Sequence, residues 1–197
     1  MHMDYFFMSR DDESAGSNPL FVMADEKSGA RYARAVGRKG PGTADEMDWL
    51  VQDISKTLKS WGRTGGSGGH LIFKSDGEPA LMAVKNAVMQ YHGGVCIPEQ
   101  PAEGEKAENG LIEEAGKTIR EYFCTFLSRI ERGVDDVIPL DSDIIPWIVR
   151  WAAVCYSRYK NGSGWQDILR KTKRTALQVY RGADGRDGAL QGAWRWR

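Results

Sequence analysis

His70-Leu-Ile-Phe-Lys-Ser-Asp-Gly-Glu-Pro79 joins a short apolar strand to the start of a helix. The strand ends at Lys74, and the polar segment from Ser75 to Glu78 forms the turn. Proline is favoured at the first position of a helix, where no hydrogen-bonded N–H is required, so Pro79 marks the beginning of the helix. Apolar residues recur after it at helical spacing, at Leu81, Val84, Val88 and Tyr91. This stretch therefore predicts a strand–helix unit of the kind found in α/β proteins.

Three short strands and one helix are expected before this unit. Apolar segments separated by polar turns predict an antiparallel meander, with strands at His2 to Met8, Leu20 to Ala24 and Ala30 to Val36. Thr43-x-x-Glu46 then has the pattern of a capping box. The apolar residues that follow it keep helical spacing until Gly62, which is expected to end the helix.

One more strand and two helices are expected after the unit. Val95-Cys-Ile97 predicts a fifth strand that stops at Pro98. A long helical pattern runs from Ile112 to Ile130, and a second apolar helix spans Ile144 to Tyr159. The order of elements predicts an α/β fold with a mixed five-stranded sheet, in which a three-strand antiparallel meander is joined by two parallel strands and flanked by helices.

The composition indicates a globular domain with a basic end. The 197 residues include seven Trp, seven Tyr and six Phe, which is enough apolar area to form a core. The 27 Lys and Arg balance the 27 Asp and Glu overall, but residues 158–197 contain ten basic and three acidic side chains. An acidic body with a basic end is compatible with a polyanionic partner. We expect a core domain at 1–160 and a basic, Gly-rich, poorly ordered tail at 161–197.

Several classes of protein are disfavoured by the sequence. No apolar run approaches the ~18 to 20 residues that span a bilayer, and the first residues lack the basic region and cleavage site of a signal peptide. Three single cysteines, at Cys96, Cys124 and Cys155, provide no disulfide framework. The glycine-rich segment 62–69 lacks the Gly-Lys-Ser/Thr ending of a phosphate loop. We therefore expect an intracellular protein that uses neither a membrane span nor a nucleotide loop.

Three acidic residues occupy positions where carboxylates can meet. Asp4 lies inside the first strand, Asp76 lies just past the end of the fourth, and Glu113 lies in the first turn of the long helix. Carboxylates from separate elements that meet in one crevice suit hard divalent cations such as Mg²⁺. The structural alternatives are a turn-forming Asp before Gly and a Glu that compensates the helix dipole. Asp4 is the hardest of the three to explain structurally, because a lone buried carboxylate is costly.

Four motifs occur in a fixed order, at His2-Met-Asp4, Met23-Ala-Asp-Glu-Lys-Ser-Gly29, Lys74-Ser-Asp76-Gly-Glu-Pro79 and Asn109-Gly-Leu-Ile-Glu113. Over about residues 1 to 175 the sequence resembles the integrase catalytic core of copia-type retrotransposon polyproteins. These cores belong to the retroviral integrase superfamily, which has a ribonuclease H-like fold. The 36 residues between Asp76 and Glu113 fit the spacing that is typical of the family.

The resemblance implies a function and a set of site residues. By position, Asp4, Asp76 and Glu113 match the catalytic carboxylates that bind two Mg²⁺ (or Mn²⁺) ions in the family. The activity implied is DNA integration, by metal-dependent phosphodiester hydrolysis and 3′-OH strand transfer. Lys117 and Arg120 lie one and two turns beyond Glu113 and match basic residues that contact DNA. The alternative is a surface ion pair between Glu113 and Lys117 at i, i+4 spacing. A homo-oligomer acting on DNA ends in the nucleus is the corresponding expectation for partners and location.

The other acidic residues near these motifs are weaker candidates. Asp25 resembles a structural turn residue, while Glu78 and Glu114 lie close to the site in sequence. His92 is expected to lie at the surface, at the end of a helix.

Two further functions stay open at this stage. The chain could be a catalytically inactive nucleic-acid-binding remnant of a retrotransposon polyprotein, or a ribonuclease H-like nuclease with the same metal chemistry. In the tail, Arg170-Lys-Thr-Lys-Arg174 and the basic residues after it are expected to neutralise DNA phosphates with little base selectivity. The alternative is a solvated tail that has no role in binding.

Overall fold

The computed structural model describes residues 1–9, 14, 16, 18–64, 70–99 and 110–159. At its centre is a five-stranded sheet with the strand order β3-β2-β1-β4-β5. The strands are β1 (His2–Phe7), β2 (Pro19–Ala24), β3 (Arg31–Ala35), β4 (Leu71–Lys74) and β5 (Cys96–Glu99). β2 pairs antiparallel with β1 and β3, and β4 pairs parallel with β1 and β5. The predicted mixed α/β sheet is confirmed.

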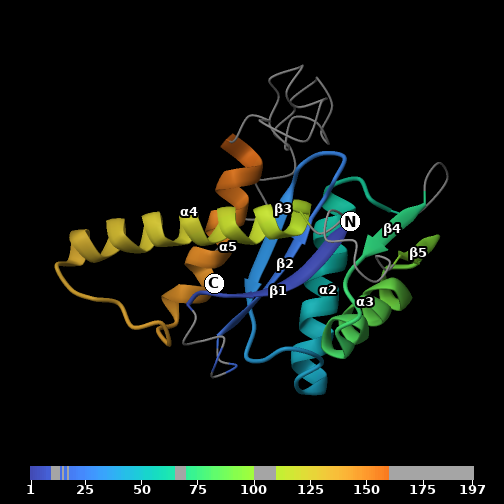
Figure 1. Cartoon of the computed structure of the whole chain (residues 1–197), viewed down its shortest axis with the longest axis horizontal. Coiled ribbons are helices and arrows are strands. Elements are labelled where there is room, and N and C mark those ends of the chain that lie inside the picture. Colours follow the sequence, from blue (N-terminus) through green and yellow to red (C-terminus); the bar gives the residue numbers. More distant parts are fainter. Residues whose placement is uncertain (10–13, 15, 17, 65–69, 100–109, 160–197) are drawn as a thin grey trace.

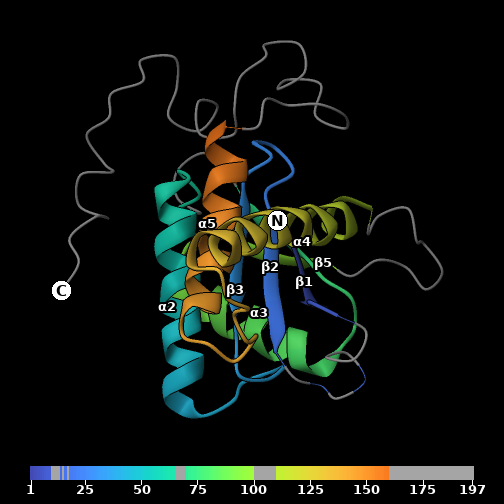
Figure 2. The same ribbon diagram turned by 90° about the vertical axis from the view of Figure 1, so that its left-hand side faces the viewer.

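Helices pack on both faces of this sheet, as Figures 1 and 2 show. They are α2 (Ala44–Ser60), α3 (Pro79–His92), α4 (Gly110–Val134) and α5 (Ile144–Tyr159). Buried residues of α2 and α3 form one core with Met3 and Tyr5 of β1. Buried residues of α4 and α5 form a second core on the other face, and Phe6 of β1 packs against it. Because strand side chains alternate between faces, Asp4 belongs to the same face as Phe6 and α4.

The predicted helix starts at Thr43 and Pro79 are confirmed. The Thr43 hydroxyl accepts a hydrogen bond from the Glu46 N–H at 3.2 Å, and the Thr43 N–H donates to the Glu46 carboxylate at 2.8 Å. Pro79 is the first residue of α3. Gly62 has a φ of 71°, a conformation that glycine adopts without strain, and follows Trp61, the C-cap residue of α2.

Two local predictions are wrong. β5 continues through Pro98 to Glu99, because β5 is an edge strand and an edge position does not require the missing N–H. His92 is buried rather than exposed. Its Nδ1 lies 2.9 Å from the Ser55 hydroxyl on α2, and its Nε2 lies 2.7 Å from the carbonyl oxygen of Arg63. His92 at the end of α3 is therefore buried against α2, where the Ser55 hydroxyl provides a polar contact for its ring.

Some predicted features lie outside the described residues. These are the tail 161–197 with its basic residues, the glycines at 65, 66, 68 and 69, and Asn109 of the fourth motif. The division at residue 160 and the DNA-binding role of the tail stay predictions. Among the helices that the structure describes, none is both long and apolar enough to cross a membrane.

Candidate metal and nucleic-acid site

Asp4 is a half-buried carboxylate in the middle of the sheet. Its Oδ1 accepts a hydrogen bond from the Tyr5 N–H at 2.7 Å. Burial is the main reason why the pKa of Asp4 is raised from 3.8 to about 6. The negative charges of Asp76 and Glu78 raise this pKa as well, while the Tyr5 N–H and the Lys39 ammonium lower it. The ionised carboxylate thus lacks sufficient positive charge around it, a condition that a bound cation would relieve.

The register of the parallel strands brings Asp76 next to Asp4. His2 of β1 lies opposite Lys74 of β4, so two residues further along each chain Asp4 comes level with Asp76. β4 has ended by this point, and Asp76 lies in the turn that leads into α3. The Oδ1 of Asp76 accepts a hydrogen bond from the Glu78 N–H at 3.1 Å, which fixes the turn. The carboxyl end of a parallel strand is where α/β proteins commonly bind ligands.

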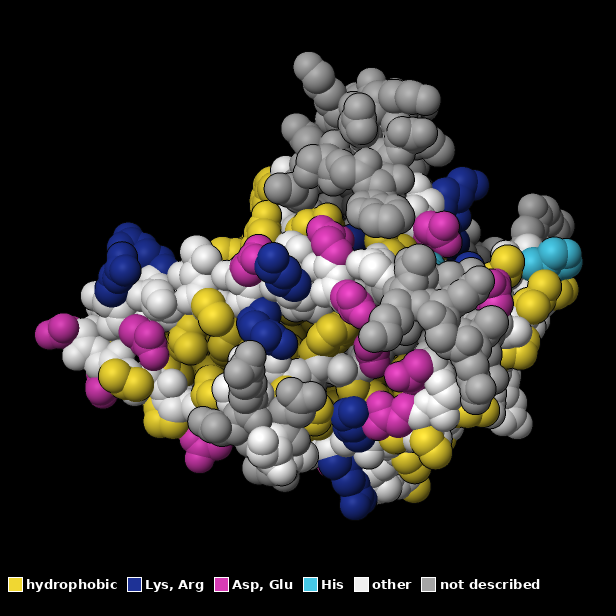
Figure 3. All heavy atoms as spheres, in the orientation of Figure 1, with side chains coloured by type: hydrophobic (Ala, Val, Ile, Leu, Met, Phe, Trp, Pro, Cys, Tyr) yellow, Lys and Arg dark blue, Asp and Glu magenta, His cyan; other side chains and the backbone are white. Residues whose placement is uncertain are grey.

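Asp4, Asp76 and Glu78 form the acidic cluster of this site. Each provides a carboxylate oxygen, and the three oxygens lie within 4.8 Å of one another. All three residues are half-buried. Figure 3 shows acidic side chains gathered on this face of the molecule, with basic side chains at the border of the group. Oxygen ligands at this separation are compatible with Mg²⁺ or Mn²⁺.

Lys39 is the basic residue that contacts the acidic cluster. It lies between β3 and α2, and its Nζ is 3.0 Å and 3.1 Å from the two carboxylate oxygens of Glu78. The ammonium also lies over the rings of Tyr5 and Phe7, at 5.7 Å and 5.4 Å from their centroids. The buried Lys85 ammonium also attracts the Asp76 carboxylate electrostatically. Two positive charges therefore act on three carboxylates, which leaves the group with excess negative charge when all three are ionised.

Helix α4 crosses β1 at very close range. A Cβ at position 116 would overlap the ring of Phe6, so Gly116 permits the approach. On the other edge of the buried face of α4, Glu114 forms an ion pair with Arg31 of β3 at 2.7 Å. Gly116 thus lies on the edge of α4 that faces β1, and Glu114 lies on the edge that faces β3.

The predicted third carboxylate, Glu113, is not part of the acidic cluster. Its side chain is exposed in the first turn of α4. Successive residues are separated by about 100° around a helix. Glu113 is therefore the neighbour of Gly116 around the helix, on the side of α4 that faces β1 and not on the side that carries Glu114. Arg120 follows on nearly the same line, Lys117 lies further toward solvent, and both side chains are exposed. The predicted acid and the predicted DNA contacts therefore share the β1 side of α4.

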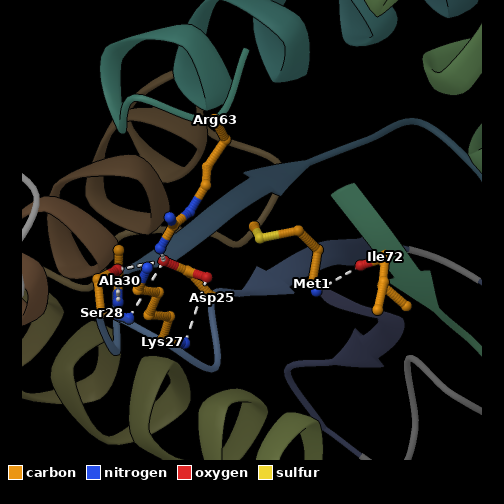
Figure 4. Close-up of polar contacts among 7 residues, drawn as sticks. All are labelled: Met1, Asp25, Lys27, Ser28, Ala30, Arg63 and Ile72. Atoms are coloured by element: carbon orange, nitrogen blue, oxygen red, sulfur yellow. Dashed lines mark hydrogen bonds and ion pairs between the residues drawn. The ribbon is translucent and has the colours of Figure 1, made fainter. Parts of the chain in front are cut away.

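Ion pairs within the fold account for the acidic side chains of Asp25 and Glu114. Asp25 is buried in the turn after β2, where its carboxylate accepts hydrogen bonds from Ser28 and pairs with Arg63 at 2.6 Å (Figure 4). Burial alone would raise its pKa, but the Ser28 and Arg63 hydrogen bonds and the Arg63 charge lower it below the usual value. Asp25 is therefore ionised within a structural ion pair, and Glu114 is engaged by Arg31.

Sequence reasoning missed Lys39 and ranked Glu78 low. The two residues are separated by 39 positions, and no local spacing connects them. The sequence did contain a signal for Lys39. In Gly37-Arg-Lys-Gly40, two basic residues lie between glycines in the connection that follows the third strand. Only the fold shows that this connection reaches the turn after β4.

Comparison with known proteins identifies the fold. No protein-family model and no curated protein sequence matches the chain. Among solved structures, the catalytic core domain of BIV integrase is similar with a TM-score of 0.53 and 14% identity, covering 91% of this chain and 91% of that one. A chain of the simian T-cell lymphotropic virus intasome in complex with PP2A regulatory subunit B56 gamma has a TM-score of 0.60 and 14% identity, covering 92% of this chain and 53% of that one. This chain therefore has the ribonuclease H-like fold of retroviral integrase catalytic cores.

Proposed function

We propose that this chain is the catalytic core of an integrase-type polynucleotidyl transferase, as its resemblance to copia-type retrotransposon integrases implies. The reaction would be hydrolysis of a phosphodiester at a DNA end, followed by joining of the freed 3′-OH to target DNA. The observation on which the proposal depends is that Asp4 and Asp76 lie together at the junction of β1 and β4. Similarity to the fold of integrase cores supports the assignment.

The donor set suits hard divalent cations. Asp4 and Asp76 would be ligands for Mg²⁺ or Mn²⁺, and Glu113 is proposed as the third catalytic carboxylate on the strength of the resemblance. Glu78, whose oxygen is already within 4.8 Å of the other two, is the alternative. If two divalent ions were bound there, they would supply activation of an attacking oxygen and stabilisation of a leaving oxygen at phosphorus. The raised pKa of Asp4 supports cation binding, because the carboxylate lacks a sufficient counter-charge.

The protein side chains around the cluster would position the nucleic acid. Lys117 and Arg120 are exposed on the β1 side of α4, where they can neutralise phosphates without reading bases. A homo-oligomer that holds paired DNA ends in the nucleus fits this role, and the intasome among the similar structures supports the proposal.

The decisive experiment measures cleavage and joining of labelled DNA ends with Mg²⁺ or Mn²⁺. We expect Asp76→Asn to abolish both reactions while the circular dichroism spectrum stays unchanged. Asp48→Asn, which alters an exposed acid on α2, serves as the matched control and should leave both reactions intact. Cleavage without joining would favour a nuclease on this fold, and DNA binding without either reaction would favour an inactive remnant. Full activity of Asp76→Asn would refute the metal site.

The same assay separates the two candidates for the third carboxylate. Loss of activity in Glu113→Gln with activity kept in Glu78→Gln supports the Asp4, Asp76 and Glu113 assignment. The reverse result would transfer the role to Glu78 in the acidic cluster.

A further inference from the structure

We propose that Lys39 is a phosphate-binding residue, which contacts the nucleic-acid phosphate next to the one held at the acidic cluster. The inference depends on the proposed function, since it assigns one more contact to the same substrate. Lys39 belongs to the connection between β3 and α2 and lies outside the motifs on which the resemblance is based.

The position of Lys39 is fixed from several sides. The Gly40 N–H donates a hydrogen bond to the Tyr5 hydroxyl at 3.1 Å, which ties the connection to β1. Gly40 has a φ of 89° and lies against Ala80 in the first turn of α3, where an added Cβ would be 3.3 Å from the Ala80 Cβ. The rings of Tyr5 and Phe7 lie beneath the ammonium. Lys39 is therefore held at the border of the acidic cluster before any substrate arrives.

The ammonium has capacity for another partner. It contacts the two oxygens of Glu78 at 3.0 Å and 3.1 Å, and its side chain is still 33% exposed. An ammonium group has three donors and rotates freely, so a ligand can approach from solvent. A cation bound by Asp4 and Asp76 would also reduce the negative potential that holds Lys39 against Glu78.

A phosphate is the ligand that this arrangement fits best. The Glu78 carboxylate contacts the Lys39 ammonium at 3.0 Å, and one of its oxygens lies within 4.8 Å of carboxylate oxygens of Asp4 and Asp76. A nucleic-acid strand that places one phosphate at a cation bound by Asp4 and Asp76 would therefore place the adjacent phosphate near the Lys39 ammonium. Such a contact fixes the register of the strand and provides no base selectivity.

The experiment measures binding of a fluorescent DNA duplex by anisotropy, in Ca²⁺ to limit cleavage, across about 50 to 300 mM KCl. We expect Lys39→Gln to weaken binding about tenfold, equal to about 1.4 kcal/mol. The slope of log Kd against log salt should fall by about 0.9, the value for one lost phosphate contact. Lys39→Arg, which keeps the positive charge, should retain the wild-type affinity and the wild-type salt slope. Lys56→Gln, which removes the same charge from an exposed position on α2, should change neither by a comparable amount.

A structural role would give a different result. If Lys39 only balances the charge of Glu78, Lys39→Gln will tighten Mn²⁺ binding and leave the salt slope of DNA binding unchanged, and the inference is then wrong. Wild-type protein that binds DNA but shows no metal-dependent cleavage would refute the proposed function alone, because the salt slope still reports on Lys39. Absence of any duplex binding by the wild type would overturn both.

Discussion

Replacing Asp4 by Asn should stabilise the folded protein, by an amount that depends on pH. Folding raises the pKa of this carboxyl from 3.8 to about 6. At 1.36 kcal/mol per pKa unit, the ionised form is at most about 3 kcal/mol less favourable in the folded state. The folded state holds the proton more tightly, so wild-type stability falls as pH rises from about 4 to 6. Above about pH 7 the full destabilisation is present, and Asn removes it.

The assay is urea denaturation of wild type and Asp4→Asn without divalent metal. We expect Asn to raise the free energy of unfolding by about 3 kcal/mol near pH 7.5 and by only about 1 kcal/mol near pH 4.5. Adding Mg²⁺ should stabilise the wild type by mass action and leave the variant nearly unchanged. Equal effects of the substitution at both pH values, or a loss of stability near pH 7.5, would refute the argument that Asp4 lacks a counter-charge.

Three further predictions concern the surroundings of the site. Gly116→Ala should lower the free energy of unfolding by about 1–3 kcal/mol in urea, because a Cβ at this position overlaps the Phe6 ring; an unchanged value would mean that α4 does not approach β1 so closely. Lys85→Met should raise it by about 1–3 kcal/mol, because the Lys85 Nζ is buried and has no hydrogen-bond partner among the described residues. A loss of stability would instead show that the attraction between the Lys85 ammonium and the Asp76 carboxylate outweighs the cost of burying the ammonium. Asp25→Asn should destabilise by about 2–3 kcal/mol through the loss of the Arg63 ion pair, yet leave metal-dependent cleavage per folded molecule largely unchanged; loss of cleavage in fully folded protein would give Asp25 a role in the reaction.

The elements of the fold were predictable because they depend on local signals. The capping box at Thr43 and the proline at position 79 mark helix starts through contacts within a few residues. Asp4 could be singled out because a lone buried carboxylate inside an apolar strand is costly, whereas Asp76, just past a strand and before Gly, has the pattern of a turn residue and was named through the resemblance. Their proximity follows from the parallel pairing of β1 and β4, which the order of strands and helices already indicates.

The remaining features depend on long-range packing. The ion pair between Lys39 and Glu78 requires the connection after β3 to reach the first turn of α3, and no sequence spacing encodes that approach. The burial of His92 depends on Ser55 of α2, which is 37 residues away. The close crossing of α4 and β1 at Gly116 likewise joins segments that are far apart in the chain. Sequence reasoning therefore named Glu113 by resemblance, while the fold brings Glu78 into the acidic cluster.

The central claim is that Asp4 and Asp76 bind a divalent metal ion, and direct Mn²⁺ titration tests it. The titration uses electron paramagnetic resonance at about pH 7.5, where free Mn²⁺ is detected independently of any activity. We expect saturable binding by the wild type and by Glu114→Gln, whose carboxylate is engaged by Arg31. Asp4→Asn and Asp76→Asn should each weaken binding at least tenfold. Equal Mn²⁺ affinity of all four proteins would contradict the account.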